Sequence, residues 1–331
     1  MSRLASVRRL ATFGIALVVA VSPVSAIYGQ TLSEKLEQGF VQGVGWSIAE
    51  ADEIFRQALD ADSATLMERA VQAYRAAEGP YGLSQLPAIQ HLLQHRLKQQ
   101  DWPQLRRDLS TAMGIYTAHY EPDHPIFIKV SQVRAHWHLL AYFNGGEINR
   151  STDLSAVLPE LEAAYRLTTQ AIELASDHYG QAYPDLPEML RDMAAMSWLF
   201  AHHHRAGDTR AGRIQTSHSG SHRLAANDPA HDRHGYRQGR QALQGVIDLY
   251  LTDEQIEQAT LAQAWLDLSG WHQQFGYQRR AEDAYMQAQK SADALDEEQR
   301  DRLFRNKASL DPLSWLNTGL ATSLVFPNGR F

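Results

Sequence analysis

Apolar residues recur three and four positions apart along nearly the whole chain from Ser33 to Phe304. This spacing is typical of amphipathic helices, because the side chains of a strand alternate with a period of two. The pattern predicts ten helices and a further polar helix, at 47–60, 63–79, 85–99, 103–120, 125–143, 153–179, 185–206, 237–251, 255–275, 278–294 and 297–307. Most connections are short, so consecutive helices are expected to pack as antiparallel neighbours.

One helix-end signature occurs three times in this pattern. In each copy a tyrosine follows eight residues after an alanine on a predicted helix, and a proline follows soon after the tyrosine. The alanines and tyrosines are Ala73 and Tyr81, Ala112 and Tyr120, and Ala171 and Tyr179. A recurrent helix-turn unit indicates stacked repeats, and stacked repeats build extended surfaces.

The spacing of the copies is uneven. The intervals are 39 residues from Ala73 to Ala112, 59 from there to Ala171, and 117 from there to Ala288. We therefore expect an insertion at about 146–153 in the second interval. The third interval must hold one whole divergent repeat together with a long loop.

Residues 262–288 resemble one tetratricopeptide repeat (TPR) read from end to end. Six residues stand at the family's large, small and turn positions: Trp265, Leu268, Gly276, Ala281, Tyr285 and Ala288. In that family the small residues let two helices approach closely, and the aromatic residues fill the space between repeats. His272 departs from the pattern, because the family usually has tyrosine at this position.

The three upstream copies resemble the longer repeats of the kinesin light chain type, with 112–125 the closest match. The resemblance covers most of 47–295 and implies an all-α solenoid of about five antiparallel helix pairs, a TPR-like superhelix, within 27–308. Proteins of unrelated function share this architecture, so the resemblance implies binding of a protein or peptide and no particular activity.

The first 26 residues have the three-part order of a secretory signal peptide. Arg3, Arg8 and Arg9 precede the apolar stretch 10–21, and small residues lead to a predicted cleavage site after Ala26. The alternative is an uncleaved anchor, but twelve apolar residues fall short of the roughly 20 that span a bilayer. We expect a periplasmic or secreted protein, without lipidation because the chain has no cysteine.

The charge balance is acidic, with 31 basic residues, 38 acidic residues and a net charge of −7. Loss of three arginines with the signal peptide would leave 28 basic residues against 38 acidic ones, a net charge of −10. Nucleic-acid binding needs clustered lysine and arginine, so this class of partner is not expected. The absence of cysteine excludes disulfides, thiolate metal sites and cysteine nucleophiles.

A histidine-rich stretch at about 207–236 interrupts the helical pattern. Imidazoles bind zinc, copper or nickel, and the candidate ligands are His218, His222, His231 and His234. The sequence around the first two is rich in serine and glycine and forms helix poorly. We therefore favour a solvated loop inserted between two helices and predict no cofactor.

The chain carries no recognisable catalytic motif. There is no Gly-x-Ser-x-Gly and no His-Glu-x-x-His sequence, so an enzyme is not predicted. The tail 309–331 is expected to be a cap on the last repeat, with a possible strand at 320–326 that faintly resembles the start of a TonB-type C-terminal domain. The favoured hypothesis is an exported, non-catalytic scaffold in the bacterial cell envelope. The alternatives are a metal-binding protein that uses the histidine loop, and an accessory or truncated member of a TonB-like energy-transduction system.

Overall fold

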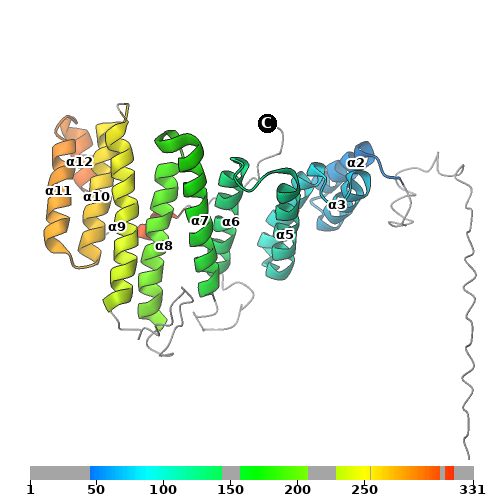
Figure 1. Ribbon diagram of the computed structural model, residues 1–331, viewed down its shortest axis with the longest axis horizontal. Coiled ribbons are helices and arrows are strands. Elements are labelled where there is room, and N and C mark those ends of the chain that lie inside the picture. Colours follow the sequence, from blue (N-terminus) through cyan, green and yellow to red (C-terminus); the bar gives the residue numbers. More distant parts are fainter. Residues whose placement is uncertain (1–44, 144–156, 208–228, 254, 306–309, 317–331) are drawn as a thin grey trace, which may run out of the picture. The chain divides into compact units, whose positions relative to one another are not determined.

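The computed structural model describes residues 45–143, 157–207, 229–253, 255–305 and 310–316. Within these residues there are eleven α-helices and no strand (Figure 1). The helices are α2 Ile48–Asp60, α3 Ala64–Glu78, α4 Leu86–Gln99, α5 Trp102–His119, α6 Ile126–Phe143, α7 Leu158–Tyr179, α8 Leu186–Gly207, α9 Pro229–Thr252, α10 Gln258–Gln274, α11 Gln278–Ser291 and α12 Glu297–Arg305. Short 3₁₀ turns occur at η2 Leu83–Gln85, η4 Gly180–Ala182 and η5 Pro312–Trp315. None of the described helices is long and apolar enough to cross a bilayer.

The helices pack as consecutive antiparallel pairs, and this confirms the predicted all-α class. The pairs are α2/α3, α4/α5, α6/α7, α8/α9 and α10/α11. The second helix of a pair also packs against the first helix of the next pair at α3–α4, α7–α8 and α9–α10, whereas α5 and α6 make little direct contact. We refer below to α6, α8 and α10 as first helices, and to α7, α9 and α11 as second helices.

Small residues allow the two helices of a pair to approach closely. They are spaced seven apart on three second helices, as Ala164 and Ala171 on α7, Gly235 and Ala242 on α9, and Ala281 and Ala288 on α11. All six are buried. A Cβ atom at Gly235 would lie 2.8 Å from the backbone oxygen of Ser197 on α8, so only glycine fits there without movement. The α8/α9 pair lies in the interval between Ala171 and Ala288, where the sequence predicts a divergent repeat.

Local sequence explains where several helices begin and end. Ser47 and Glu50 form a reciprocal capping box at the start of α2. The Asp101 side chain accepts a hydrogen bond from the Gln104 amide at the start of α5, with Pro103 in the first turn. Gly276 has a φ of +79° between α10 and α11, a conformation that glycine adopts readily.

The largest departure from the predicted boundaries is at α9. This helix begins at Pro229, eight residues before the expected start at 237, so it includes the positions of His231 and His234. Proline suits the first position of a helix because its missing N–H has no helical partner there. The expected insertion at 146–153 and the possible strand at 320–326 lie outside the described residues.

The described part of the tail does not simply extend the last helix pair. Residues 310–316 contain η5 and pack against α8 as well as α10. Leu316 is buried in a cluster with residues of α6, α7 and α8.

Candidate functional site

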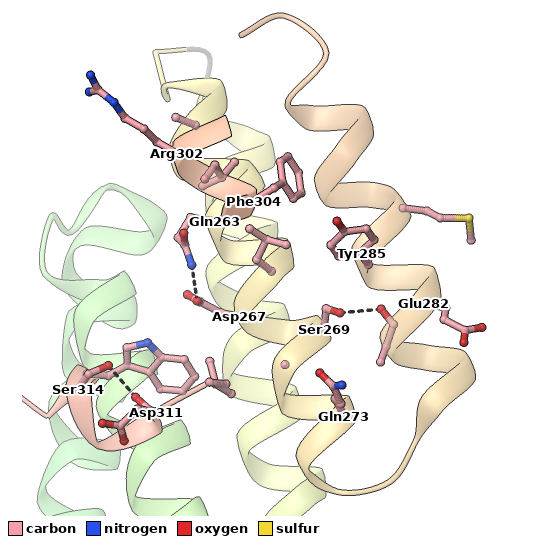
Figure 2. A pocket seen from close by; sticks show the side chains of 18 of the residues that line it. Gln263, Asp267, Ser269, Gln273, Glu282, Tyr285, Arg302, Phe304, Asp311 and Ser314 are labelled. Atoms are coloured by element: carbon pink, nitrogen blue, oxygen red, sulfur yellow. Dashed lines mark hydrogen bonds between the residues drawn. The ribbon is translucent and has the colours of Figure 1, made fainter. Parts of the chain in front are cut away.

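An open groove of about 1010 Å³ lies between α10, α11, α12 and the residues 310–315 (Figure 2). Polar and aromatic side chains line it together. The labelled lining residues are Gln263, Asp267, Ser269 and Gln273 from α10, Glu282 and Tyr285 from α11, Arg302 and Phe304 from α12, and Asp311 and Ser314 from the tail.

One ring contact and one hydrogen bond connect α11 to its neighbours in the walls of the groove. The rings of Tyr285 and Phe304 meet edge to face, with centroids 5.6 Å apart, and so join α11 to α12. The Ser269 hydroxyl donates to the backbone oxygen of Ala281 at 2.7 Å and joins α10 to α11 (Figure 2). The groove therefore has a defined shape, and the exposed Gln273 side chain lies in its lining.

Asp267 supplies a buried carboxylate on the α10 side of the groove. Its Oδ1 accepts a hydrogen bond from Gln263 Nε2 at 2.8 Å, and its Oδ2 lies 3.8 Å from Arg191 Nε on α8. Burial raises the pKa of the Asp267 carboxyl to about 6, although the Gln263 hydrogen bond and the Arg191 charge act in the opposite direction.

A second buried polar pair connects α6 and α8. His136 Nε2 lies 3.8 Å from Asp192 Oδ2, which is beyond hydrogen-bond distance. Burial lowers the pKa of His136 to about 4, and burial together with Glu188 raises the pKa of Asp192 to about 8. Both shifts favour the uncharged forms, so we interpret the contact as a neutral pair and not as an ion pair. With Asp267 and Arg191, this pair forms a buried polar seam across the first helices α6, α8 and α10.

His272 has a defined partner in the folded chain. Its Nδ1 lies 2.9 Å from the Tyr236 hydroxyl, which also accepts a hydrogen bond from Arg280 at 2.9 Å. Burial lowers the pKa of His272 to about 4, with a further contribution from the Arg280 charge, so the ring is neutral and shares a hydrogen bond with the Tyr236 hydroxyl. The histidine at this repeat position thus joins α10 to α9.

The residues that carry the family resemblance lie in the α10/α11 pair and its turn. Leu268, Ala281 and Ala288 are buried, Trp265 and Tyr285 are half-buried, and Gly276 forms the turn. Among them, Ala281 and Tyr285 line the groove.

The four histidines considered as metal ligands are not brought together by any described contact. His218 and His222 lie outside the described residues, and His231 and His234 occupy positions in α9. In the described part of the chain, no three His, Cys, Asp or Glu residues are placed to hold a metal ion.

Sequence reasoning missed the buried polar seam. Asp267 stands between Leu266 and Leu268 in an apolar stretch, and Asp192 lies four residues before Met196 on the buried side of α8. A charged residue at a core position of a helical pattern was the available signal, because such residues are rarely buried without a reason.

No protein-family model matches this chain, and no curated protein matches it either. The structure shows paired antiparallel helices, and the resemblance to tetratricopeptide repeats stays a prediction from the sequence pattern.

Proposed function

We propose that this protein is a non-catalytic scaffold of the tetratricopeptide type that binds another protein through the groove beside α10. The observation that carries the proposal is the groove itself. It presents exposed amides, carboxylates and aromatic rings from three helices and the tail, and such mixed linings suit peptide segments of a protein partner.

The repeated packing supports the same proposal. Buried small residues seven apart on α7 and α9 match the spacing of Ala281 and Ala288 on α11, in the sequence that resembles a tetratricopeptide repeat. Repeats of this kind hold first helices side by side, where their exposed residues offer one continuous surface.

The proposed place of action is the bacterial cell envelope. The basic, apolar and small-residue order of residues 1–26 supports export, and cleavage after Ala26 would release a periplasmic or secreted chain. A partner in that compartment would meet an acidic scaffold without disulfides.

The test compares two arginine substitutions at exposed glutamines of the same helix pair. Gln273 lines the groove, whereas Gln287 on α11 is exposed outside it. Tagged mature protein should capture a defined set of envelope proteins. Gln273→Arg should lose a protein that Gln287→Arg and the unmodified chain retain, because a new side chain and charge obstruct the groove. Identical capture by all three chains would contradict binding through this groove.

A further inference from the structure

Residues 310–316 lie against the first helices like a short bound peptide. Leu316 is buried with Leu158 of α7 and Leu199 of α8, among other residues. Leu310 and Trp315 pack against the cluster that contains Leu268 and Trp271 of α10. The segment is therefore held mainly by apolar side chains, in the way that anchor residues hold a peptide ligand.

Most hydrogen bonds of the segment join two residues within the segment. The Leu313 amide donates to Asp311 Oδ1 at 3.1 Å, and the Ser314 hydroxyl donates to Asp311 O at 2.6 Å (Figure 2). These bonds would persist if the segment left the surface, so its departure would leave few polar groups without a partner.

One side chain of the helical body recognises the backbone of the segment. Gln274 Nε2 donates to Leu310 O, and Gln274 Oε1 accepts from Trp198 Nε1 of α8 at 2.6 Å. The α8 tryptophan thus orients an amide toward a main-chain carbonyl, which every peptide possesses whatever its sequence. This contact suits a surface that holds peptides.

Leu310 packs directly against the backbone of α10 at Gly270. A Cβ atom at Gly270 would lie 2.8 Å from Leu310 Cβ, and the three nearest heavy atoms all belong to Leu310. Glycine within a helix is less favourable than alanine by about 1 kcal/mol, so this position gives up helix stability in favour of close contact with the tail.

We infer that residues 310–316 are a tethered occupant of a peptide-docking face on α8 and α10, and that a partner segment of the same chemistry binds by displacing them. That chemistry is an aliphatic residue followed five positions later by adjacent aromatic and aliphatic residues. The inference rests on the proposed scaffold function and adds the type of partner and the regulation of its binding.

The groove explains how displacement begins. Leu310, Asp311, Ser314 and Trp315 line one end of it, and the remainder is open. A partner can therefore occupy the open part before the segment leaves. A tether gives the segment an effective concentration in the millimolar range, so the resident segment strongly outcompetes a free peptide of equal intrinsic affinity.

The test uses a fluorescent peptide with the sequence of residues 309–317 and the full-length mature chain. Trp315→Ala combined with Leu316→Asp removes two of the three apolar anchors of the tail, leaves Leu310 in place and does not alter the docking face. This variant should bind the peptide at least about tenfold more tightly than the unmodified chain, as measured by fluorescence anisotropy. Adding Gly270→Ala should abolish the gain, whereas adding Gly114→Ala should preserve it, because a Cβ at Gly114 makes only an ordinary 3.6 Å contact with the Tyr81 ring.

A second measurement leaves the apolar anchors intact. The chain has no cysteine, so Ser314→Cys gives a single site for an environment-sensitive dye on the exposed side of the segment. Unlabelled peptide at up to about 1 mM should change the dye signal, and a peptide with alanine in place of tryptophan and its adjacent leucine should not. No change in the signal, or equal peptide binding by a folded tail variant and the unmodified chain, would overturn the inference. Capture of a partner through Gln273 would be unaffected by either result, so the inference and the proposed function can fail separately.

Discussion

At the scale of single residues, the core of this protein contains fully buried small residues and a few buried polar residues. Ala112, Ala171 and Ala288 are fully buried at helix crossings, where any larger side chain meets close-packed neighbours. Asp192 is buried on α8, and the half-buried His136 lies beside it on α6. The two classes predict opposite effects of substitution.

Ala288→Leu should destabilise the protein. Ala288 is fully buried at the crossing of α10 and α11, and overpacking of a tight core costs about 1–3 kcal/mol. Ala76→Leu is the matched control, because Ala76 is an exposed position within α3. Urea unfolding should show a lower midpoint concentration of urea for Ala288→Leu. The midpoint of Ala76→Leu should be almost that of the unmodified chain. Equal midpoints would mean that α10 and α11 do not cross as closely as the structure has them.

Asp192→Asn should stabilise the protein at pH 8 and have little effect near pH 4. The raised pKa of Asp192, about 8, means that the folded chain binds the proton more tightly than the unfolded chain. The contribution of protonated Asp192 to the free energy of unfolding is therefore lost as pH rises from about 4 to about 8. Asparagine at this position stays neutral throughout. Each unit by which the pKa differs between the two states corresponds to about 1.4 kcal/mol, so we expect a gain of at least about 1 kcal/mol at pH 8.

The measurement is urea unfolding at several pH values, with exposed Asp293→Asn as the control. His136 and His272 have lowered pKa values, so protonating them removes stability from the folded chain as pH falls from about 6.5 to about 4. The comparison is made between variants at each pH, because this loss is common to them. A difference between Asp192→Asn and the unmodified chain that does not grow with pH would contradict the neutral pair.

At the scale of elements, the recurrent helix-end signature has a mechanical role. His119 precedes Tyr120, and its Nε2 lies 2.7 Å from Tyr81 O in the loop before α4. His178 precedes Tyr179, and its Nε2 lies 2.5 Å from Asp123 O in the loop before α6. The last turns of α5 and α7 thus each contact the loop that leads into their own helix pair.

Residues that are far apart in sequence connect the helix pairs on the two sides of the α5–α6 boundary. Arg106 on α5 pairs with Glu160 on α7, and His138 Nδ1 lies 2.7 Å from the same carboxylate. Burial alone would raise the pKa of Glu160, but the hydrogen bond from His138 and the charge of Arg106 lower it below its ordinary value. These contacts link the second and third pairs where direct helix packing is sparse.

Deletion of 209–227, replaced by about six glycine and serine residues, should leave the α8/α9 pair folded. The two helices pack directly against each other, and loop length changes stability only slowly. Circular dichroism should show the same helicity and a melting temperature within about 4 °C of the unmodified chain. Loss of cooperative melting would show that the histidine-rich stretch is part of the core.

The same stretch is predicted not to hold a structural metal. Ordering a serine- and glycine-rich segment costs about 1–2 kcal/mol per residue, which only several well-placed ligands offset. Micromolar zinc should therefore raise the melting temperature little. A large zinc-dependent rise that disappears on changing His218 and His222 to alanine would favour the metal-binding alternative.

At the scale of the whole molecule, the helix pairs supply a frame, and the groove and the tail supply the proposed binding function. Larger side chains at the helix crossings of this frame are expected to destabilise the fold, because the crossings use small buried residues. The tail segment is attached through a few apolar anchors and the Gln274 amide, so it is the part that exchange with a partner would alter first.

Export should remove the first 26 residues. Mass spectrometry of protein recovered from the envelope fraction is expected to give a chain that begins at Ile27, because the small residues before it fit the signal-peptidase pattern. Ala26→Arg should block this cleavage, and a lysine at Ser33, beyond the site, should not. Recovery of the unmodified chain with Met1 intact in membrane pellets would contradict the proposed location.

The sequence alone determined the helices and their pairing. Apolar spacing, the capping residues Ser47 and Asp101, and the turn at Gly276 are local signals, so they predicted most helix boundaries to within a few residues. The start of α9 was missed because its polar, histidine-rich composition gave no apolar periodicity, and the proline at its first position was the weaker signal.

Only the tertiary structure decided which residues face one another. The seam of His136, Asp192 and Asp267 joins three helices that are far apart in sequence, and the groove adds a fourth and a fifth from α11 and α12. The close contact of Leu310 with Gly270 likewise depends on the tail folding back onto α10. Local propensity carries no information about such contacts, because they arise from the packing of whole helix pairs.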